Sequence, residues 1–355
     1  MEGMLLDKEY NLVEMIDIFD SFIWTDRFLG YGDFEIFMPA GLGFQTEIQQ
    51  DYYITTKDSE RYMIVEKIEL DTEPEIGTHL TVSGRSLEAI LVRRIIWGQV
   101  LLRGNLQDGI EKLLNENAIK PSDPARIIPK LSFKRSTDER ITSLTVEAQF
   151  IGDNLYDAIY ILCEYGSLGF RVLPVGNGGF EFELYLGEDR SYAQDSLPSV
   201  VFSPAYENLL SSNYIETKMS FRNAALVGGE GEGAAQVRVE ALSVSGIQGL
   251  DRREIYVDAS GLSSKTEDGD LSPAVYRQQL STKGLEELSK TYGIAAFEGE
   301  IDATRQFVYG VDFFIGDIVQ VVNEYGFDSQ SRIVELIVTH DSGGISFIPT
   351  FESIN

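Results

Sequence analysis

The chain has 355 residues, of which 43% are hydrophobic and 11% aromatic, so it can bury more than one hydrophobic core. Its 29 Lys and Arg residues stand against 57 Asp and Glu residues, and the formal net charge of -28 disfavours stable binding to nucleic acid or to an anionic membrane. Glycine is frequent (33 residues) and proline sparse (10 residues), and many segments alternate apolar with polar residues, which predicts a mainly β protein of two or more domains.

The N-terminal segment carries acidic residues where a secretory signal has a basic start, and no apolar run approaches the roughly 18 residues of a membrane-spanning helix. The single cysteine, Cys163, lies in an apolar helical stretch and has no partner for an intrachain disulfide. We interpret it as a buried structural thiol, and we expect the protein to be made and kept soluble.

The first predicted block covers residues 1–100. Leu87, Ile90, Leu91 and Ile95 recur at helical spacing near its end, with Ser86 as the candidate N-cap. Before this helix, alternation with a period of two predicts β-strands. We therefore expect a small β-barrel or sandwich with a closing helix, and we take it as the first β-barrel. The alternating runs extend over residues 10–18, 34–38, 62–70 and 80–82.

The second predicted block, residues 101–198, has α+β character. A helix begins behind Asn105 as candidate N-cap, and a second helix starts near Asp153 and ends at Gly166, where a glycine cap belongs. Residues 170–175 and 180–187 then predict two strands around the glycine-rich turn at 176–179. The apolar faces of the two helices consist of Leu106, Ile110, Leu113 and Leu114, and of Leu155, Ala158, Ile159 and Leu162.

The third predicted block, residues 199–355, is a second β-barrel region with a helical insert at about 272–293. A long alternating segment from Ile215 to Val227 is predicted to pair with residues 236–244. The insert begins at Ser272 as N-cap, followed by Pro273, and is closed by Gly293, while Gly284 is a candidate break within it. Three strands at 317–324, 331–340 and 345–351 follow, with strong hairpin chemistry at residues 341–344.

The glycine-rich GGEGEG segment at residues 228–233 is not interpreted as a phosphate-binding loop. No GK[ST] follows it, no helix opens after it, and Glu230 and Glu232 would repel a phosphate. We expect a hairpin tip at this position.

Metal and nucleophilic chemistry find no support in the residue patterns. His79 and His340 are the only histidines, and each lies in a predicted strand, which favours structural roles. No G-x-S-x-G motif places a serine at a strand-to-helix turn. Carboxylate pairs for glycoside hydrolysis are not assignable, because their spatial separation is not visible in a sequence with this many acids.

Local charge clusters are interpreted as solvated surface rather than as sites. None of the acidic clusters has the twelve-residue pattern of a calcium loop. The prominent arginines fit ordinary surface ion pairs, or pairing with the acids of a neighbouring subunit. We therefore assign no catalytic, cofactor-binding or metal-binding residue and no cofactor. The acidic clusters are Asp251/Glu254, Glu267/Asp268/Asp270 and Glu298/Glu300/Asp302, and the arginines are Arg85, Arg93, Arg94, Arg252 and Arg253.

Several segments, taken together in their order, resemble the tail-hub proteins of long-tailed siphophages and their prophage relatives. They extend over nearly the whole chain: WTDRFLGYGDFEIFMPA, VSGRSLEAILVRRIIW, FSPAYENLLSSNYIET leading into NAALVGGEGEG, and YGVDFFIGDIVQVVNEYG. The resemblance implies a hub fold akin to the baseplate hub of contractile phages, with two tube-protein-like β-barrels and smaller α+β domains.

The same resemblance implies a non-enzymatic virion protein, made in the cytoplasm of the bacterial host. Three copies would form a pseudo-hexameric ring at the tail tip that joins the tail tube to the tip and lets DNA pass during ejection. The implied partners are distal tail and tail-tube proteins, a tape-measure protein and central fibre or tip proteins, with DNA only in transit and no stable membrane binding. The alternatives are a tail-tip carbohydrate-binding, receptor-binding or cell-wall-degrading protein, or the hub of a tail-derived injection device.

Overall fold

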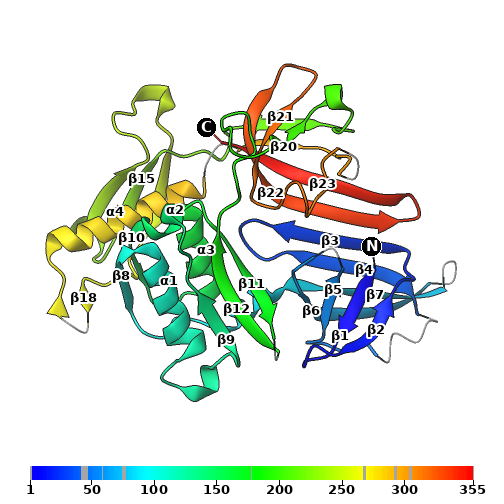
Figure 1. Ribbon diagram of the computed structural model, residues 1–355. Helices are drawn as coiled ribbons and strands as arrows, with labels where there is room; N and C mark the ends of the chain where they lie inside the picture. The colour runs from blue at the N-terminus through cyan, green and yellow to red at the C-terminus, as the bar shows by residue number, and fades with distance from the viewer. Residues whose placement is uncertain are drawn as a thin grey trace.

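The computed structural model describes residues 2–40, 47–57, 59–73, 77–176, 178–266, 269–291, 294–303 and 306–354. It is mainly β with several sheets and few helices, as the alternating sequence pattern predicts (Figure 1). Within the described residues, no helix is both long and apolar enough to cross a membrane.

The first block is built from seven strands. The four alternating runs fall mainly on strands, and side chains of several of these strands form a core around Phe22, Trp24, Phe34 and Ile36. Leu12, Ile18 and Leu70, which the alternation placed on buried faces, are exposed. The strands are β1 (Gly3–Leu6), β2 (Leu12–Ile16), β3 (Ser21–Arg27), β4 (Asp33–Pro39), β5 (Tyr53–Thr56), β6 (Met63–Glu73) and β7 (Gly77–Ser86).

The closing helix differs from the prediction. Residues Leu87–Arg93 form a 3-10 helix, η3, rather than an α-helix, and Ile95 lies beyond its end with about half of its side chain exposed. Ser86 does not cap it, because its hydroxyl accepts a hydrogen bond from the Gly32 backbone N–H at 2.8 Å. The interaction with a distant glycine therefore replaces the local cap.

The second block has the predicted α+β character. Asn105 caps α1 by accepting from the Asp108 N–H at 3.1 Å, as predicted. Gly166 directly follows α3 but keeps an ordinary helical φ of -83°, and a Cβ there would lie 3.2 Å from Leu144. The predicted hairpin is β11–β12, and β9 adds to it in parallel. The elements are β8 (Val100–Asn105), α1 (Leu106–Leu114), η4 (Asn115–Ile119), η5 (Pro124–Arg126), β9 (Leu131–Lys134), α2 (Glu139–Thr142), β10 (Thr145–Phe150), α3 (Leu155–Tyr165), β11 (Gly169–Val175) and β12 (Gly179–Tyr185).

The long strand predicted from Ile215 to Val227 is two strands in different sheets. β14 (Asn213–Thr217) pairs with β20 (Ile294–Glu298), whereas β15 (Ala224–Gly228) pairs with β16 (Arg238–Leu242) and β17 (Glu254–Asp258). The prediction of one continuous strand was wrong. Ile215, Ala225 and Val227 all lie at odd-numbered positions, so the alternation does not reveal the turn between Thr217 and Ala224. The pairing of the second half with residues 236–244 is confirmed.

The helical insert is α4 (Pro273–Ser289), and Ser272 caps it by accepting from the Val275 N–H at 3.3 Å. Gly284 does not break it. A Cβ at this position would lie 2.6 Å from both the Ala241 and Val227 side chains, so the glycine lets the helix approach the sheet closely. The helix ends at Ser289, and Gly293 lies outside the described residues.

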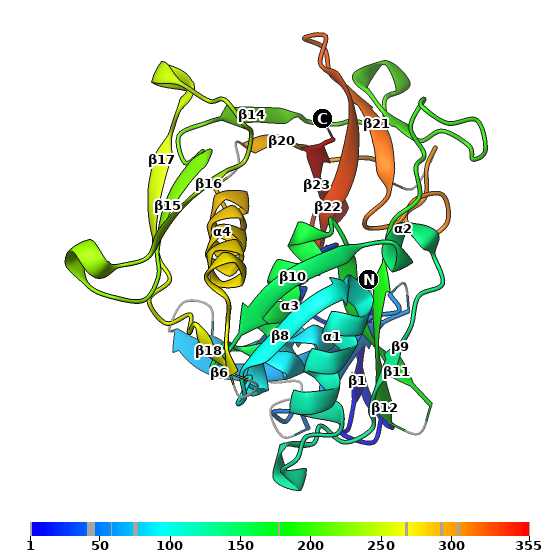
Figure 2. The ribbon, with the colours of Figure 1, turned by 90° about the vertical axis from the view of Figure 1, so that its left-hand side faces the viewer.

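The sheet β16–β15–β17 and helix α4 form one unit, which we call the arm. Its core is built around Ala225, Val227, Val257 and Leu280. Figure 2 shows α4 between this sheet and β10, and α4 contacts both. The arm therefore packs against the second block. The remaining strands near it are β18 (Lys265–Thr266) and β19 (Gly269–Asp270).

One thirteen-stranded sheet joins the first block to the C-terminal strands. β13 (Val201–Phe202) and the predicted meander of β21 (Ile318–Val322), β22 (Asp328–Asp341) and β23 (Gly344–Ser353) belong to it, and β22 pairs directly with β3. The order is β14-β20-β23-β22-β3-β4-β7-β6-β5-β1-β2, with β21 paired to β22 and β13 paired to β21. Neither barrel-like half is closed in the described residues, because their edge strands pair with each other instead (Figure 1).

The described residues form four hydrophobic clusters, one of them in the arm. The largest belongs mainly to the second block but includes Leu6, Tyr53 and Ile64 from the first. The C-terminal cluster likewise includes Phe28 from the loop after β3. The predicted ranges 1–100, 101–198 and 199–355 stay predictions.

Candidate functional site: a buried charge network and an apolar cavity

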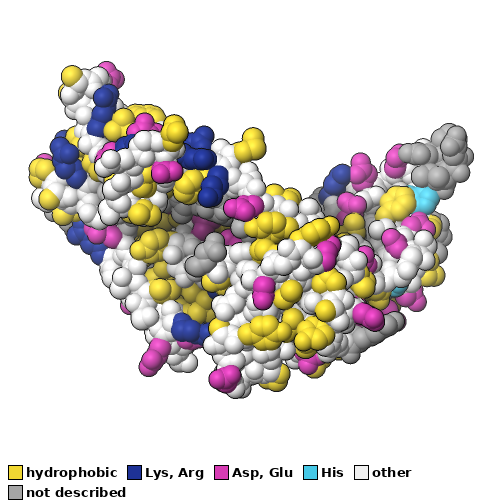
Figure 3. Space-filling view, turned by 90° about the horizontal axis from the view of Figure 1, so that it is seen from above, with side chains coloured by type: hydrophobic (Ala, Val, Ile, Leu, Met, Phe, Trp, Pro, Cys, Tyr) yellow, Lys and Arg dark blue, Asp and Glu magenta, His cyan; other side chains and the backbone are white. Residues whose placement is uncertain are grey.

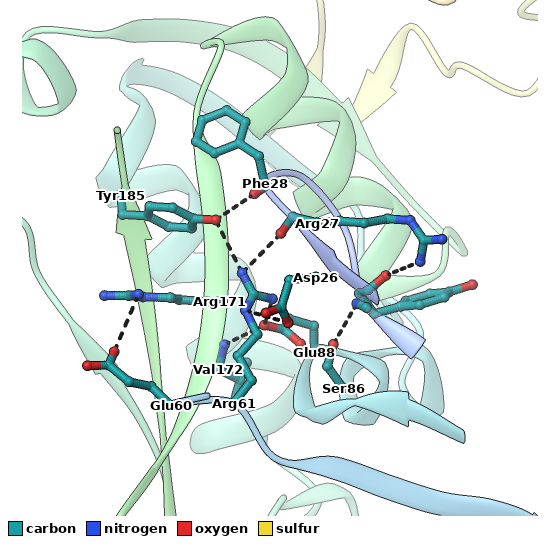
Figure 4. Close-up of polar contacts among 12 residues, drawn as sticks. Asp26, Arg27, Phe28, Glu60, Arg61, Ser86, Glu88, Arg171, Val172 and Tyr185 are labelled. Carbon is teal, nitrogen blue, oxygen red and sulfur yellow. Dashed lines mark hydrogen bonds and ion pairs between the residues drawn. The ribbon is translucent and has the colours of Figure 1, made fainter. Parts of the chain in front are cut away.

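A buried arginine, Arg61, lies between side chains of the first and second blocks (Figure 4). The Arg61 guanidinium donates to Glu88 Oε1 at 3.1 Å, and its Nε lies 3.6 Å from Asp26 Oδ1. The three side chains are at most 8% exposed. Burying three ionisable groups lowers stability unless each is paired and hydrogen-bonded. We call these three residues and their hydrogen-bonding partners the junction network.

Partners from other elements complete the junction network. Glu88 Oε1 also accepts from the Val172 N–H on β11 at 3.1 Å. The Tyr185 hydroxyl on β12 accepts from Arg61 at 3.2 Å and donates to the Phe28 carbonyl at 3.1 Å, as the dashed lines of Figure 4 show. The network thus ties the β3 end to the β11–β12 hairpin.

The electrostatics of the network keep Arg61 charged. Burial lowers the pKa of Arg61, but the neighbouring Glu88, Tyr185 and Asp26 outweigh burial and hold that pKa above its usual range. Burial raises the pKa of Asp26, against the opposing effect of Arg61. Burial also raises the pKa of Tyr309, which hydrogen-bonds to Asp26 from the C-terminal part of the chain. Arg61 is therefore a permanent cation whose fixed partners hold β3, η3 and the β11–β12 hairpin together.

An apolar cavity of about 280 Å3 lies between the first and second blocks. Its walls are Tyr53, Ile64, Ile90, Ile128 and Phe180, from β5, β6, η3, the segment before β9, and β12. A cavity with apolar walls and a few polar groups is the usual form of a ligand or peptide pocket.

The mouth of this cavity is basic. Lys8 and Arg93 share one carboxylate, Asp51, at 3.7 Å and 3.0 Å. Arg94 has no ion pair with a carboxylate in the described residues, and it donates instead to the Arg126 carbonyl at 2.7 Å. Burial, with Arg126 and Arg93 nearby, lowers the pKa of Arg94. The residues that line the cavity therefore include three cations and one carboxylate, in a chain whose net charge is -28.

The two histidines lie on strands, as predicted. His79 on β7 stacks on Phe37 with ring centroids 4.6 Å apart, and its Nε2 lies 3.4 Å from Asp20. His340 on β22 lies opposite Phe22 and packs against Phe19. Over the described ranges, no three His, Cys, Asp or Glu side chains gather closely enough to hold a metal ion.

The other candidate residues have structural surroundings. Cys163 is fully buried in α3, and burial raises the pKa of its thiol. Glu230 in the GGEGEG segment accepts from the Ser264 hydroxyl at 2.6 Å and from its N–H at 3.0 Å, so its carboxylate holds the loop. Among the acidic clusters, Glu254 pairs with Arg252, whereas Glu267 and Asp268 lie outside the described residues.

Three of the five arginines singled out in the sequence make ordinary surface contacts. The Arg85 guanidinium donates two hydrogen bonds, of 2.6 and 2.8 Å, to the Glu66 carboxylate. Arg252 lies between Glu240 and Glu254, and Arg253 donates to the Lys218 carbonyl. Figure 3 shows that Lys and Arg side chains gather on the arm side of the upper face, beside exposed hydrophobic side chains, while acidic side chains are spread more widely.

Sequence reasoning missed the junction network. Arg61 stands alone in a polar segment, and nothing near it in the sequence marks it as buried. The one available signal was Glu88, a single charge inside the apolar run LEAIL, of which all five residues are buried. A charge in the middle of a buried run requires a partner.

The chain is similar to proteins of phage tails. A family model described as Siphovirus ReqiPepy6 Gp37-like protein matches residues 2–351. Its fold is similar to that of a 43 kDa tail protein of prophage MuSo2 from Shewanella oneidensis, with 12% identity, 99% and 98% of the two chains covered and a TM-score of 0.60. A tail protein from Neisseria meningitidis MC58 gives 13% identity, 99% and 96% coverage and a TM-score of 0.60.

A third structure extends this similarity to a further host. Prophage tail protein gp18 from Listeria monocytogenes EGD-e gives 12% identity, 100% and 96% coverage and a TM-score of 0.53. At these identities the similarity concerns the fold. No curated protein matches the sequence significantly.

Proposed function

The chain belongs to the Siphovirus ReqiPepy6 Gp37-like protein family, and from this premise we propose that it is a structural, non-enzymatic hub of the phage tail tip. Three copies form a pseudo-hexameric ring that joins the tail tube to the tip, and DNA passes through it during ejection. The observation that carries this proposal is the fold shared along almost the whole chain with tail proteins from three bacteria, two of which are described as prophage proteins.

The joined sheet supports a ring built from six half-units. β3 and β22 pair from Arg27–Glu335 to Ser21–Asp341, and an ion pair of 2.6 Å between Arg27 and Glu335 lies at the end of this ladder. One copy therefore already places two sheet halves side by side. A ring of three copies needs only to repeat such a contact between copies.

The two ends of the sheet carry free strand edges with exposed apolar side chains. β14 ends the sheet on one side and exposes Tyr214 and Ile215. On the other side β2 exposes Leu12, and the outer half of β6, beyond its pairing with β5, exposes Leu70. Exposed edge strands are templates for pairing with another chain, and head-to-tail pairing of unlike edges produces a ring when the rotation closes.

Cysteine cross-linking tests this contact in the isolated protein. Cys163 is buried, so cysteines introduced by Ile215→Cys together with Leu12→Cys or Leu70→Cys are the reactive thiols. A short bismaleimide should link one of the two double variants into dimers and closed trimers, separated by denaturing electrophoresis, because the two edges belong to different copies.

The single variants and the pair Ile215→Cys/Tyr325→Cys are the controls, since Tyr325 is exposed in the turn before β22. Absence of trimers in both double variants, at concentrations where sedimentation shows association, would contradict pairing through these edges. A monomer in reconstructed tail tips would overturn the ring itself.

We further propose that the acidity serves DNA passage. Carboxylates facing a central channel would repel the phosphates of passing DNA, whereas a basic lining would retain it. The neighbours in the tail would be distal tail, tail-tube, tape-measure and central fibre or tip proteins. Replacing channel-facing carboxylates by lysine should slow genome ejection without blocking assembly, and normal ejection in several such variants would contradict this role.

A further inference from the structure

We propose that the apolar cavity with the basic mouth is a docking site for an acidic extended segment of another protein, whose aromatic or long aliphatic side chain enters the cavity. The cavity lies within one copy of the chain, between β5, β6, η3 and β12. The inference therefore does not rest on the ring and is testable with the isolated protein.

The size and walls of the cavity select one inserted side chain. A volume of about 280 Å3 with walls of Tyr53, Ile64, Ile90 and Phe180 suits an aromatic or long aliphatic group. Burial of such a group provides the main attraction, because apolar area removed from water stabilises a complex.

The charges at the mouth select the flanking residues of the partner. Among the side chains that line the cavity, one is a carboxylate, Asp51, and three are cations, Lys8, Arg93 and Arg94, although the chain has about two acids for every base. Arg94 is held by the Arg126, Arg93 and Ile127 carbonyls, which orient the guanidinium without neutralising its charge. Arg94 is thus oriented but has no ion pair with a carboxylate in the described part of the chain, so its guanidinium can bind carboxylates of another protein.

Exposed apolar side chains continue the site beyond Arg94. Ile95, Trp97 and Ile127 are exposed, with Trp97 60% exposed, and the Arg126 guanidinium lies 4.2 Å from the Trp97 ring centroid. Arg126 also donates to the Ile95 carbonyl, so these residues are contiguous with the mouth. Tryptophan and arginine are the residues most enriched among binding hot spots.

The charge balance favours a segment of another protein over a second copy. At physiological ionic strength, charges more than about 8 Å apart are largely screened, so a short acidic segment interacts mainly with the cations at the mouth. A second copy would bring a large acidic surface, from a chain of charge -28, against the same face.

The probe is a fluorescein-labelled peptide, Asp-Glu-Phe-Asp-Glu, and its binding is measured by fluorescence anisotropy. We expect saturable binding that weakens with salt and is lost when Ala replaces Phe or Lys replaces the acids. Arg94→Glu and Arg93→Glu should each weaken binding at least tenfold. Arg93 is exposed, so Arg93→Glu should leave the fold intact. It therefore tests the charge of the mouth even if Arg94→Glu disturbs the fold.

Arg103→Glu is the matched control, because Arg103 also pairs with one carboxylate on the surface, Glu147 at 3.2 Å, and lies outside the cavity lining. It should leave binding unchanged. The inference is overturned if the peptide does not bind the folded chain at millimolar concentration, or if it binds both charge-reversed variants as tightly as the original. Self-association that the peptide displaces and that Arg93→Glu abolishes would instead assign the cavity to a second copy.

Discussion

Two arginines of this chain each lie between two carboxylates, and they differ mainly in burial. Arg61 at the junction lies 3.1 Å from Glu88 and 3.6 Å from Asp26, with its side chain 6% exposed. Arg252 in the arm lies 2.6 Å from both Glu240 and Glu254, which are more than half exposed. The shorter ion pairs are the exposed ones, so distance alone does not rank the two clusters.

The hydrophobic core next to the junction also buries larger side chains than the core of the arm. The core that adjoins the junction contains fully buried Leu91, Phe170, Val172 and Phe182. In the arm, three of the core residues are Ala225, Ala241 and Ala259, while Leu226, Tyr256 and Leu250 are exposed. Less apolar area is buried for each residue of the arm, and we infer that the arm opens more readily than the junction.

The largest expected effect is the loss of Arg61. Arg61→Ala leaves Glu88 and Asp26 buried without their cation, which should cost about 3–5 kcal/mol of unfolding free energy. Arg252→Ala removes an arginine that also has two carboxylate partners, but these are more than half exposed, so the loss of unfolding free energy should be much smaller. Urea unfolding at neutral pH measures both.

The combined variant Arg61→Met/Glu88→Gln/Asp26→Asn separates the two parts of this cost. Removing all three charges should restore part of the stability, since no unpaired ion is left buried. Equal losses of unfolding free energy in Arg61→Ala and Arg252→Ala would contradict the inferred difference between the junction and the arm.

A smaller effect is expected within the arm at Gly284. In Gly284→Val the new side chain meets Ala241 and Val227, whose atoms already lie 2.6 Å from the Cβ position, so α4 must move away from the sheet. The cost should be about 1–3 kcal/mol. Hydrogen exchange should accelerate in β15, β16 and α4 and stay unchanged in β3 and β11.

Gly261→Ala is the control within the same unit, because nothing lies within 4 Å of the corresponding Cβ position. It should leave exchange unchanged. Acceleration that spreads to the junction would show that the arm and the junction unfold together.

The sequence predicted features that depend on near neighbours. Asn105 and Ser272 cap helices as expected, because an N-cap hydrogen bond reaches only three residues along the chain. The meander of β21, β22 and β23 was predicted for the same reason, since its turns are short. Ser86 failed as a cap because its partner, Gly32, is 54 residues away.

Contacts between distant segments were not predictable from residue patterns. The β3–β22 ladder joins residues 308 apart at the Arg27–Glu335 pair, and alternation is compatible with many partners. The same holds for the junction network and for the cavity, whose walls come from five separate elements. Local periodicity reports which face of a strand is buried, and it does not report which strand lies next to it.

The smallest expected effect concerns Glu183, a buried carboxylate of β12 whose two cationic partners, Lys134 and Arg171, are more exposed than it is. Its oxygens accept from Lys134 at 2.7 Å and from Arg171 at 2.6 Å. Burial alone would raise the pKa of Glu183, but the hydrogen bonds and charges of Lys134 and Arg171 outweigh burial and hold that pKa below its usual value.

A carboxylate whose pKa is lower in the folded than in the unfolded protein stabilises the fold above the unfolded pKa, about 4.3 for Glu, and this stabilisation is lost as the pH falls through the folded pKa. Glu183→Gln should therefore lower the unfolding free energy at pH 7 by about 1 kcal/mol and converge with the original chain at acid pH. Glu181→Gln on the same strand removes a longer contact to the same lysine, 3.8 Å, and should have less effect. Parallel stability curves for Glu183→Gln and the original chain, measured by urea unfolding from pH 3 to pH 7, would contradict a lowered pKa and would place this carboxylate with the exposed pairs of the arm.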